Sequence, residues 1–341
     1  MKLLTFSEGE SGKHQFGVVV NNRIYSFDAI QLKFGTQHSG LHDIYAYLNQ
    51  LPESQQQAQQ LVNSIQQAFS QADMIESFGL DEIRIHSPIP NPAALLDFGL
   101  TPRHLKNSAY TLLKHEFNPI LIPFIKPFIN RKMDKMAQSE ILPYYKGNHN
   151  AISGYNDTVH WPSYTSYLDI EPELAIVYGN ERQPIAGYTI LNDMSERDVQ
   201  FPEMIGTGPA RSKDFDRSNG MGPFMVTPDE IDNPLDLKVA TRIGNRFEWH
   251  GNTSEYCRKP EEVIVFAKSV FTLKPGTVFG MGTIPDCTGL DHNLWLLPGE
   301  HIEITFDKLG TLKQHIPENI GSIEASRWKS RQELFQFYRK P

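Results

Sequence analysis

The stretch Tyr167–Gln200, YLDIEPELAIVYGNERQPIAGYTILNDMSERDVQ, contains two apolar runs that we predict to form β-strands. Side chains alternate between the two faces of a strand, so Asp169, Glu171 and Glu173 share one face. Asp193 follows the second apolar run and can close the cluster from the other side. Like charges on a strand face repel unless water or a cation offsets them. Because hard divalent cations bind several carboxylate oxygens, we predict a metal site here; a solvated strand face is the alternative.

The composition of the 341-residue chain allows two domains and excludes several classes of partner. Lys plus Arg number 32 and Asp plus Glu number 40, so the net charge of -8 argues against nucleic acid or an anionic membrane as a partner. Two cysteines, Cys257 and Cys287, are too few for a disulfide framework or a cysteine-built zinc site. The sequence shows neither a signal-peptide pattern nor an apolar run of the ~20 residues that span a bilayer. We therefore expect a soluble, cytoplasmic protein.

The N-terminal part of the chain predicts a small α+β domain over residues 1–87. Within it, Asn21 and Asn22 form a two-residue turn between apolar segments, which predicts a β-hairpin. The predicted elements are strands at 1–6 and 16–27 and helices at 41–48 and 53–72. Three prolines within residues 87–92 suit neither a helix nor a strand interior, so this segment is predicted to be a linker.

Residues 88–341 predict a second domain that is rich in strands. The predicted strands are 151–153, 166–178, 185–191, 223–227, 237–243, 263–271, 277–281 and 301–306; the predicted helices follow Pro102 and cover 195–200, 322–338 and, as the alternative for the sixth strand, 261–269. The strands do not alternate regularly with helices, which favours an antiparallel or mixed sandwich or barrel over a doubly wound sheet. A long loop at 117–147 carries the basic sequence KPFINRKMDKM, and long loops in compact domains are often lids.

Three further side chains are candidates for catalysis or binding. His104 follows Thr101-Pro102, which has the form of a helix N-cap and first helical residue, so its neutral form is favoured in the first turn. A neutral histidine suits a general base near pH 7; a structural histidine is the alternative. Lys213, after a Gly- and Pro-rich stretch, can bind a substrate carboxylate or an enolate oxygen if it is buried near a metal; an exposed loop lysine is the alternative. The Gly282-Thr283 turn can present an N–H group and a hydroxyl to an oxyanion.

Asp97 ends the apolar run 93–96 directly after the linker, in the same way as Asp193 ends the later run. This shared form is consistent with a common site. The sequence contains no GxGxxG, Walker, GxSxG or CxxC motif, so dinucleotide-binding, P-loop and α/β-hydrolase functions have no support.

Several motifs, in order along the chain, resemble the fumarylacetoacetate hydrolase superfamily over residues 90–310. They are DIEPELA at 169–175, GYTILNDMSERDVQ at 187–200, and shorter matches at 222–224, 251–254, 273–276 and 282–284. The resemblance implies an α+β, mostly β fold, namely a mixed β-sandwich roll of the fumarylacetoacetate hydrolase C-terminal type. Residues 88–341 would then be the catalytic domain, beside the small N-terminal α+β domain, and the protein would be a homodimer.

The resemblance also implies a site. The implied metal ligands are Asp97, Glu171, Glu173 and Asp193, whereas Asp169 is not a ligand. The implied cofactor is Mg²⁺, with Mn²⁺ or Ca²⁺ as alternatives. The implied catalytic residues are His104, which activates water, Lys213 and Arg197; the implied substrate-binding residues are Gln200, Tyr145 and Thr283.

The chain departs from the pattern of the tyrosine-degrading enzyme of this superfamily at four points. Gly99 and Leu113 replace a tyrosine and an arginine that contact a four-carbon diacid tail, which counts against fumarylacetoacetate itself as substrate. Pro172 stands within the Glu-x-Glu pair and removes a backbone donor, so we expect a strand edge or a bulge there. The acid that orients His104 is not evident, and Glu116 is the candidate.

The resemblance therefore predicts a metal-dependent hydrolase that cleaves a carbon–carbon bond in a 1,3-dicarbonyl, acylpyruvate-like substrate. The expected partner is a small oxo acid or diketone, and the acyl specificity is expected to lie in the lid at 113–146. One alternative keeps the metal site but makes the protein a decarboxylase, hydratase or isomerase of a 2-oxo acid. The other is a non-catalytic module that binds Ca²⁺.

Overall fold

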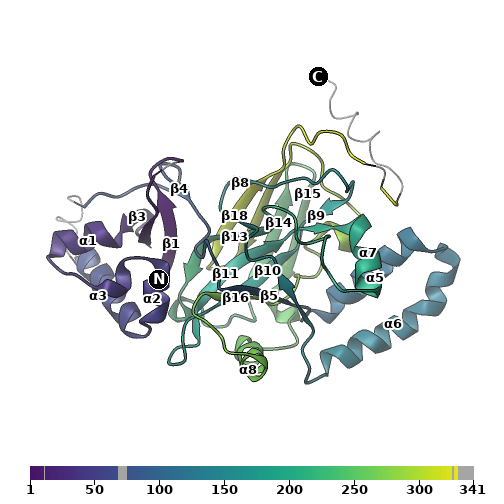
Figure 1. The fold of residues 1–341 in the computed structure, drawn as a ribbon, viewed down its shortest axis with the longest axis horizontal. Coiled ribbons are helices and arrows are strands. Elements are labelled where there is room, and N and C mark those ends of the chain that lie inside the picture. Colours follow the sequence, from purple (N-terminus) through teal and green to yellow (C-terminus); the bar gives the residue numbers. More distant parts are fainter. Residues whose placement is uncertain (11, 68–74, 325, 329–341) are drawn as a thin grey trace.

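The two strands predicted within Tyr167–Gln200 lie side by side at the centre of the larger β-sheet (Figure 1). The computed structural model describes residues 1–10, 12–67, 75–324 and 326–328. In it, β10 (Pro172–Tyr178) pairs antiparallel with β11 (Ile185–Asp193), and every residue of β10 is buried. The acidic end of each strand is thus fixed in the middle of the sheet, because each of the two strands has a neighbouring strand on both sides.

The described residues form two main sheets. The larger has the order β3-β2-β1-β13-β11-β10-β16-β5-β6, with β4 on β1 and β7 on β13, and the smaller has the order β15-β14-β17-β18-β8. The other members of the larger sheet are β1 (Lys2–Ser7), β2 (Gln15–Val20), β3 (Arg23–Ser26), β4 (Arg84–Ile85), β5 (Ala94–Phe98), β6 (Tyr144–Gly147), β7 (Ile152–Ser153), β13 (Asn219–Val226) and β16 (Thr277–Gly280). The smaller sheet contains β8 (Asp157–Thr158), β14 (Lys238–Ile243), β15 (Phe247–Asn252), β17 (His301–Phe306) and β18 (Gly310–His315), while β9 (Leu168–Asp169) pairs with β12 (Ser195–Glu196).

Apolar side chains fill a core on each face of the central strands. Leu174 and Ile176 of β10 belong to the core that includes side chains of the smaller sheet. Ala175 and Val177 belong to the other core, which the N-terminal segment supplies with residues such as Tyr47. Burial on both faces explains why this strand is an almost continuous apolar run. The predicted fold, an α+β arrangement of mixed sheets stacked as a sandwich, is confirmed.

The N-terminal segment joins the larger sheet directly, because β1 pairs antiparallel with β13. The predicted hairpin is confirmed: β2 and β3 pair around Asn21 and Asn22, both at positive φ. The helices α1 (Phe27–Phe34), α2 (Ile44–Asn49) and α3 (Glu53–Gln67) gather at one end of the molecule in Figure 1. Their side chains share a core with β10 and β11, and the domain boundary at residue 87 stays a prediction.

The helices predicted near 41–48 and 53–72, after Pro102 and at 195–200 are confirmed, whereas the helices at 27–34 and 289–292 were not predicted. The helices of the described chain are α1 (Phe27–Phe34), α2 (Ile44–Asn49), α3 (Glu53–Gln67), α5 (Pro102–Glu116), α6 (Ile122–Ala137), α7 (Arg197–Ile205), α8 (Pro260–Val270) and α9 (Gly289–His292), with 3₁₀ turns η1 (Ser39–Leu41), η2 (Pro119–Leu121), η3 (Pro228–Glu230) and η4 (Thr253–Glu255). The predicted helix at 322–338 falls largely outside the described residues. None of the helices described combines the length and the apolar character needed to cross a bilayer.

Two predictions of local structure were wrong. The strand predicted at 263–271 is helix α8, as in the alternative, because Pro260 and two acidic residues begin a helix whose buried residues Val263, Ile264 and Ala267 have helical spacing. The loop predicted at 117–147 contains helix α6, which packs against α5 and forms an arm at the other end of the molecule in Figure 1. The sequence concealed α6 because it carries an internal proline and its Phe124 and Phe128 are exposed rather than buried.

Gly187 allows the close approach of β11 to β13, and we predict that it is required for stability. A Cβ atom at this position would lie 2.6 Å from the carbonyl oxygen of Val226 and 2.8 Å from Cγ of Met225. Overpacking of this kind costs about 1–3 kcal/mol, so Gly187→Ala is expected to lower the free energy of unfolding in urea by that amount. The control is Gly79→Ala, whose Cβ meets nothing nearer than 3.5 Å. Equal stability of the two variants would contradict the prediction.

Candidate active site

Three buried carboxylates meet near the ends of strands β5, β10 and β11 of the larger sheet. Asp97 lies near the end of β5, Glu173 in β10 and Asp193 at the end of β11. One oxygen of each carboxylate lies within 4.8 Å of the others, and no side chain of the three is more than 5% exposed. We call these three residues the carboxylate cluster. The strands that carry them are ordered β11-β10-β16-β5, so residues from distant parts of the chain arrive at one point.

The carboxylate cluster is electrostatically strained. Burial raises the pKa of Asp97 well above its ordinary value, and the neighbouring Asp193 raises it further. The pKa of Glu173 is likewise raised well above its ordinary value, first by burial and then by Asp97. Among the described side chains, Oδ1 of Asp193 is a buried atom with no hydrogen-bond partner. Buried like charges with an unpaired oxygen are the arrangement that a divalent cation neutralises.

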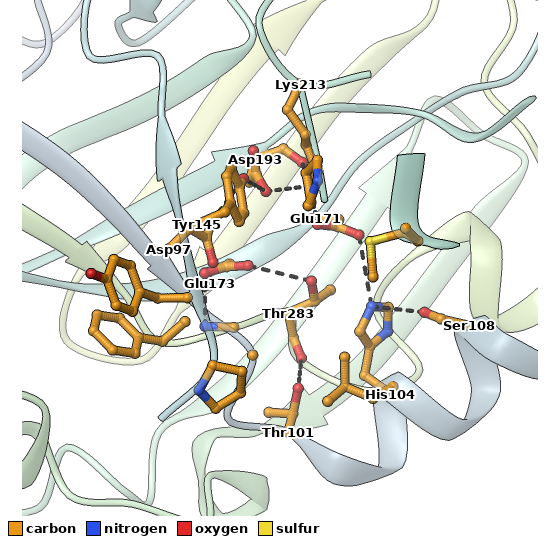
Figure 2. Close-up of a pocket in the computed structure, with 18 of the residues that line it drawn as sticks. Asp97, Thr101, His104, Ser108, Tyr145, Glu171, Glu173, Asp193, Lys213 and Thr283 are labelled. Atoms are coloured by element: carbon orange, nitrogen blue, oxygen red, sulfur yellow. Dashed lines mark hydrogen bonds and ion pairs between the residues drawn. The ribbon is translucent and has the colours of Figure 1, made fainter. Parts of the chain in front are cut away.

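Glu171, the fourth predicted ligand, is held by cations instead. Its Oε2 accepts a hydrogen bond of 2.5 Å from Nζ of Lys213, and its Oε1 accepts one of 2.5 Å from Nη1 of Arg197. Although burial raises the pKa of Glu171, Arg197 and Lys213 outweigh it and hold the pKa well below the ordinary value. Glu171 lies between the carboxylate cluster and His104 in Figure 2, and its place among the metal ligands stays a prediction.

Lys213 is buried, which answers the alternative of an exposed loop lysine. Its ammonium group donates to Glu171 and to Oδ2 of Asp193. Tyr145, on β6, donates its hydroxyl to the same Oδ2 and lies 3.4 Å from Oδ2 of Asp97. Both side chains therefore touch the carboxylate cluster, as expected for residues that would also meet a bound substrate.

The Gly282-Thr283 turn faces a carboxylate of the protein. The N–H group of Gly282 donates to Oε2 of Glu173 at 2.8 Å, and the Thr283 hydroxyl donates to Oε1 at 3.3 Å. The predicted donors are thus present, but in this structure they orient Glu173. Pro172 is not at a strand edge as expected; it is the first residue of the central strand β10, where a missing N–H group is tolerated.

His104 lies in the first turn of α5 and faces the pocket (Figure 2). Its Nδ1 lies 3.0 Å from Oδ1 of Asp291, and its Nε2 lies 3.0 Å from Oγ of Ser108 and 3.7 Å from Oε1 of Glu171. Burial lowers the pKa of His104, but the carboxylates of Asp291 and Glu171 outweigh burial and raise it to about 9. The neighbouring carboxylates thus shift the pKa of His104 in the direction opposite to the one expected from the helix terminus.

Asp291 is the acid that orients His104, and the candidate Glu116 was wrong. Glu116 instead accepts hydrogen bonds of 2.6 Å from Arg327 and from the indole of Trp328. Asp291 lies 187 residues beyond His104, on the short helix α9, and its other oxygen accepts from the N–H group of Asp286. No local signal in the sequence marks Asp291, since only the folded chain brings α9 to α5.

Arg197 and Asp169 connect that helix to the site. Arg197 is fully buried and donates to Oδ2 of Asp169 from Nε at 2.9 Å and from Nη2 at 2.8 Å, besides its bond to Glu171. Asp169 also accepts from the N–H groups of Gly289 and Leu290, both at 2.8 Å, at the start of α9. Asp169 therefore lies outside the carboxylate cluster and anchors the helix that carries Asp291.

A cavity of about 230 Å³ connects these groups, a size suited to a small molecule. It includes the carboxylate cluster, Glu171, His104, Lys213, Gln200, Tyr145 and Thr283, so the predicted site residues other than Arg197 line one pocket. Gln200 accepts a hydrogen bond of 2.9 Å from Arg197. The predicted lid segment 113–146 supplies Met136, Pro143, Tyr144 and Tyr145 to the wall, and α5 residues before it supply Leu105, Ser108 and Leu112. That this segment sets the acyl specificity stays a prediction.

Comparisons with known proteins agree with this geometry. The chain is 26% identical to an uncharacterized protein of Staphylococcus epidermidis over 331 residues, which are 94% of this chain and 100% of that protein. Two solved structures superpose with a TM-score of 0.63. One is maleylpyruvate hydrolase from Sphingobium sp. SYK-6 in complex with manganese(II) ion and pyruvate, at 19% identity over 93% of this chain and 99% of that chain. The other is 2-keto-3-deoxy-D-arabinonate dehydratase complexed with magnesium and 2,5-dioxopentanoate, at 21% identity over 94% and 100%.

At these identities the two structures show the fold. The sequence profile described as Fumarylacetoacetate (FAA) hydrolase C-terminal matches residues 125–317, which is more than half of the chain. The motif resemblance is thereby confirmed, and the protein belongs to the fumarylacetoacetate hydrolase family.

Proposed function

We propose that this protein is a divalent-metal-dependent hydrolase that cleaves the carbon–carbon bond of an acylpyruvate-like 2,4-dioxo acid. The observation that carries the proposal is the pairing, in one buried pocket, of the carboxylate cluster with His104 and its Asp291 brace. The cluster can hold a hard cation, and an oriented imidazole can take a proton from water. Neither feature alone would support a reaction.

The residues present fit a bound Mg²⁺ or Mn²⁺. Asp97, Glu173 and Asp193 offer oxygen donors, and the unpartnered Oδ1 of Asp193 indicates that a positive ligand completes the cluster. When bound, the metal would supply Lewis-acid polarisation of two substrate oxygens. The solved relatives that contain manganese with pyruvate, or magnesium with 2,5-dioxopentanoate, support a metal and an oxo acid as the ligands.

His104 would act as the general base. Asp291 fixes its Nδ1, which leaves Nε2 to face the cavity beside Ser108. With a divalent cation held by Asp97, Glu173 and Asp193, part of the negative field would be compensated, so the neutral form of His104 would become more favourable. His104 then takes a proton from water, and the resulting hydroxide attacks the 4-carbonyl carbon of the substrate.

The bond between C3 and C4 then breaks, and its electron pair passes to the pyruvate part as an enolate. Lys213, whose ammonium group already lies among carboxylate oxygens, is suited to stabilise that developing charge. Protonation of the enolate at C3 gives pyruvate, and the acyl part leaves as a carboxylate, so water is the only co-reactant. Arg197, Gln200, Tyr145 and Thr283 are proposed to hold Glu171 and the substrate in place.

Other reactions of a 2-oxo acid remain alternatives at the same site, and the products distinguish them. Decarboxylation releases CO₂, isomerisation conserves mass, and hydrolysis adds water and gives two acids. A module that only stores Ca²⁺ would not need the buried pair of His104 and Asp291. The homodimer and the cytoplasmic location stay predictions from the sequence.

The hydrolase proposal is tested by ultraviolet assay of 2,4-dioxo acids with and without metal. We expect metal-dependent loss of the enol absorbance, no loss after chelation, and recovery on addition of Mg²⁺ or Mn²⁺. Mass spectrometry should show pyruvate and one further acid. Metal-independent turnover, or no turnover across a panel of acyl groups, would contradict the proposal.

Metal binding itself is predicted to depend on Asp97. Because the pKa of Asp97 is raised, its ionised form destabilises the metal-free fold at neutral pH, and Asp97→Asn should not lower metal-free stability. The same variant should lose the stabilisation that metal gives, which is about 2.7 kcal/mol at 100 times the Kd. Thermal unfolding with and without Mn²⁺ measures both effects. Asp198→Asn, a buried aspartate bonded to Thr165 and Ser166, should keep the metal effect.

Asp291 is predicted to be a positioning residue for His104. Asp291→Asn should lower kcat by roughly 10²–10⁴-fold, the range expected when general-base catalysis is lost, with little change in KM or metal affinity. The matched control is Glu116→Gln, which alters the acid bonded to Arg327 and should leave kcat unchanged. Steady-state kinetics of the two variants measure kcat and KM. An equal loss of kcat in both would contradict the assignment of Asp291 as the positioning residue.

A further inference from the structure

Away from its charged groups, much of the pocket wall is apolar. The apolar side chains come from the end of β5, the α5–α6 arm, α7 and the loop before β6, and they include Phe98, Leu105, Leu112, Met136, Pro143 and Met204. The space beside Gly99 has the same character, because the atoms nearest to a Cβ atom there would be carbons of Leu105 and Pro143, at 3.7–3.9 Å. A substrate group that extends away from the carboxylate cluster would therefore contact carbon atoms.

The basic groups that line the pocket are already paired. Nζ of Lys213 donates to Glu171 and Asp193, and Nδ1 of His104 lies 3.0 Å from Asp291. Both lie at the carboxylate end of the cavity.

Three basic residues of the α5–α6 arm contact other groups of the protein. Lys106 donates to Asp134 at 2.6 Å, Arg103 pairs with Glu255 and Asp286, and Lys126 lies over the ring of Tyr110. Among the described lining residues, a carboxylate on the far end of a substrate would find no basic side chain other than Lys213 and His104, which are already paired. Burial of such an unpaired charge beside apolar atoms is strongly unfavourable.

Resting on the proposed function, we infer that the site takes 2,4-dioxo acids whose acyl tail is apolar and uncharged, and that Met136 is a residue that selects this tail. Met136 reaches the cavity from α6, the outer helix of the arm, whereas the other apolar wall residues lie closer to the sheet or on α5 and α7. A thioether side chain is flexible and adapts to chains of different shape. Discrimination against substrates with a charged acyl tail thus arises at the α5–α6 arm, away from the reacting carbons.

The test compares two substrates of matched length, a 2,4-dioxo acid with an unbranched alkyl tail and its analogue with a terminal carboxylate. We expect kcat/KM for the alkyl substrate to exceed that for the diacid by roughly 10²-fold, mainly through KM. Equal or better turnover of the diacid would overturn the inference while leaving the proposed hydrolase intact.

Two arginine variants on α6 distinguish a specific role of Met136 in tail selection from a general effect of adding a positive charge to this helix. Met136→Arg places a cation at the wall, so the preference for the alkyl tail should narrow about ten-fold or more, because the diacid gains a charged partner. Met133→Arg is the matched control: Met133 is half-buried on the same helix, is absent from the described pocket wall, and should keep the wild-type ratio. An unchanged ratio in Met136→Arg, with both variants folded by circular dichroism, would overturn the role of Met136.

A binding measurement distinguishes failure of the inference from failure of the proposed reaction. The thermal shift produced by each acid in the presence of Mn²⁺ does not require turnover. A larger shift with the alkyl acid and no cleavage would support the tail selection and overturn the hydrolase. No shift with either acid would overturn both.

Discussion

The mutual repulsion of three buried carboxylates is the constraint on which the rest of this structure depends. Asp97, Glu173 and Asp193 lie on strands that are hydrogen-bonded into one sheet, so the backbone does not allow them to move apart. Their charge has to be offset by donors and cations brought from elsewhere. The N–H group of Gly282, the hydroxyls of Tyr145 and Thr283, and the ammonium of Lys213 all serve this purpose.

A second network extends from the segment before β10 to His104. Asp169 and Glu171 share Arg197, and Asp169 also caps the N–H groups at the start of α9. That helix carries Asp291, which holds Nδ1 of His104. The segment that supplies Asp169, Glu171 and Glu173 therefore also sets the position of the imidazole, so charged hydrogen bonds connect the carboxylate cluster to His104.

The features predicted correctly from the sequence are those that depend on interactions between residues close together in the chain. Strand alternation and the apolar runs predicted β10 and β11 and the acids at their ends, because both depend on neighbouring residues. Helix α6 was missed since its exposed phenylalanines and internal proline obscure the helical pattern. Glu116, the candidate acid in the predicted lid region, bonds to Trp328 instead, and the acid that contacts His104 lies 187 residues away from it in the sequence.

The sequence by itself determined the family, the mixed sandwich fold and the residue types of the candidate site, because these are written in local patterns and ordered motifs. The tertiary structure alone decided which oxygens meet, which acid braces His104, and that the charge of Glu171 is taken by Lys213 and Arg197. It also decided that the far wall of the pocket is apolar. The physical reason is that charge pairing and pocket polarity depend on distances between residues remote in the chain, which the order of residues does not contain.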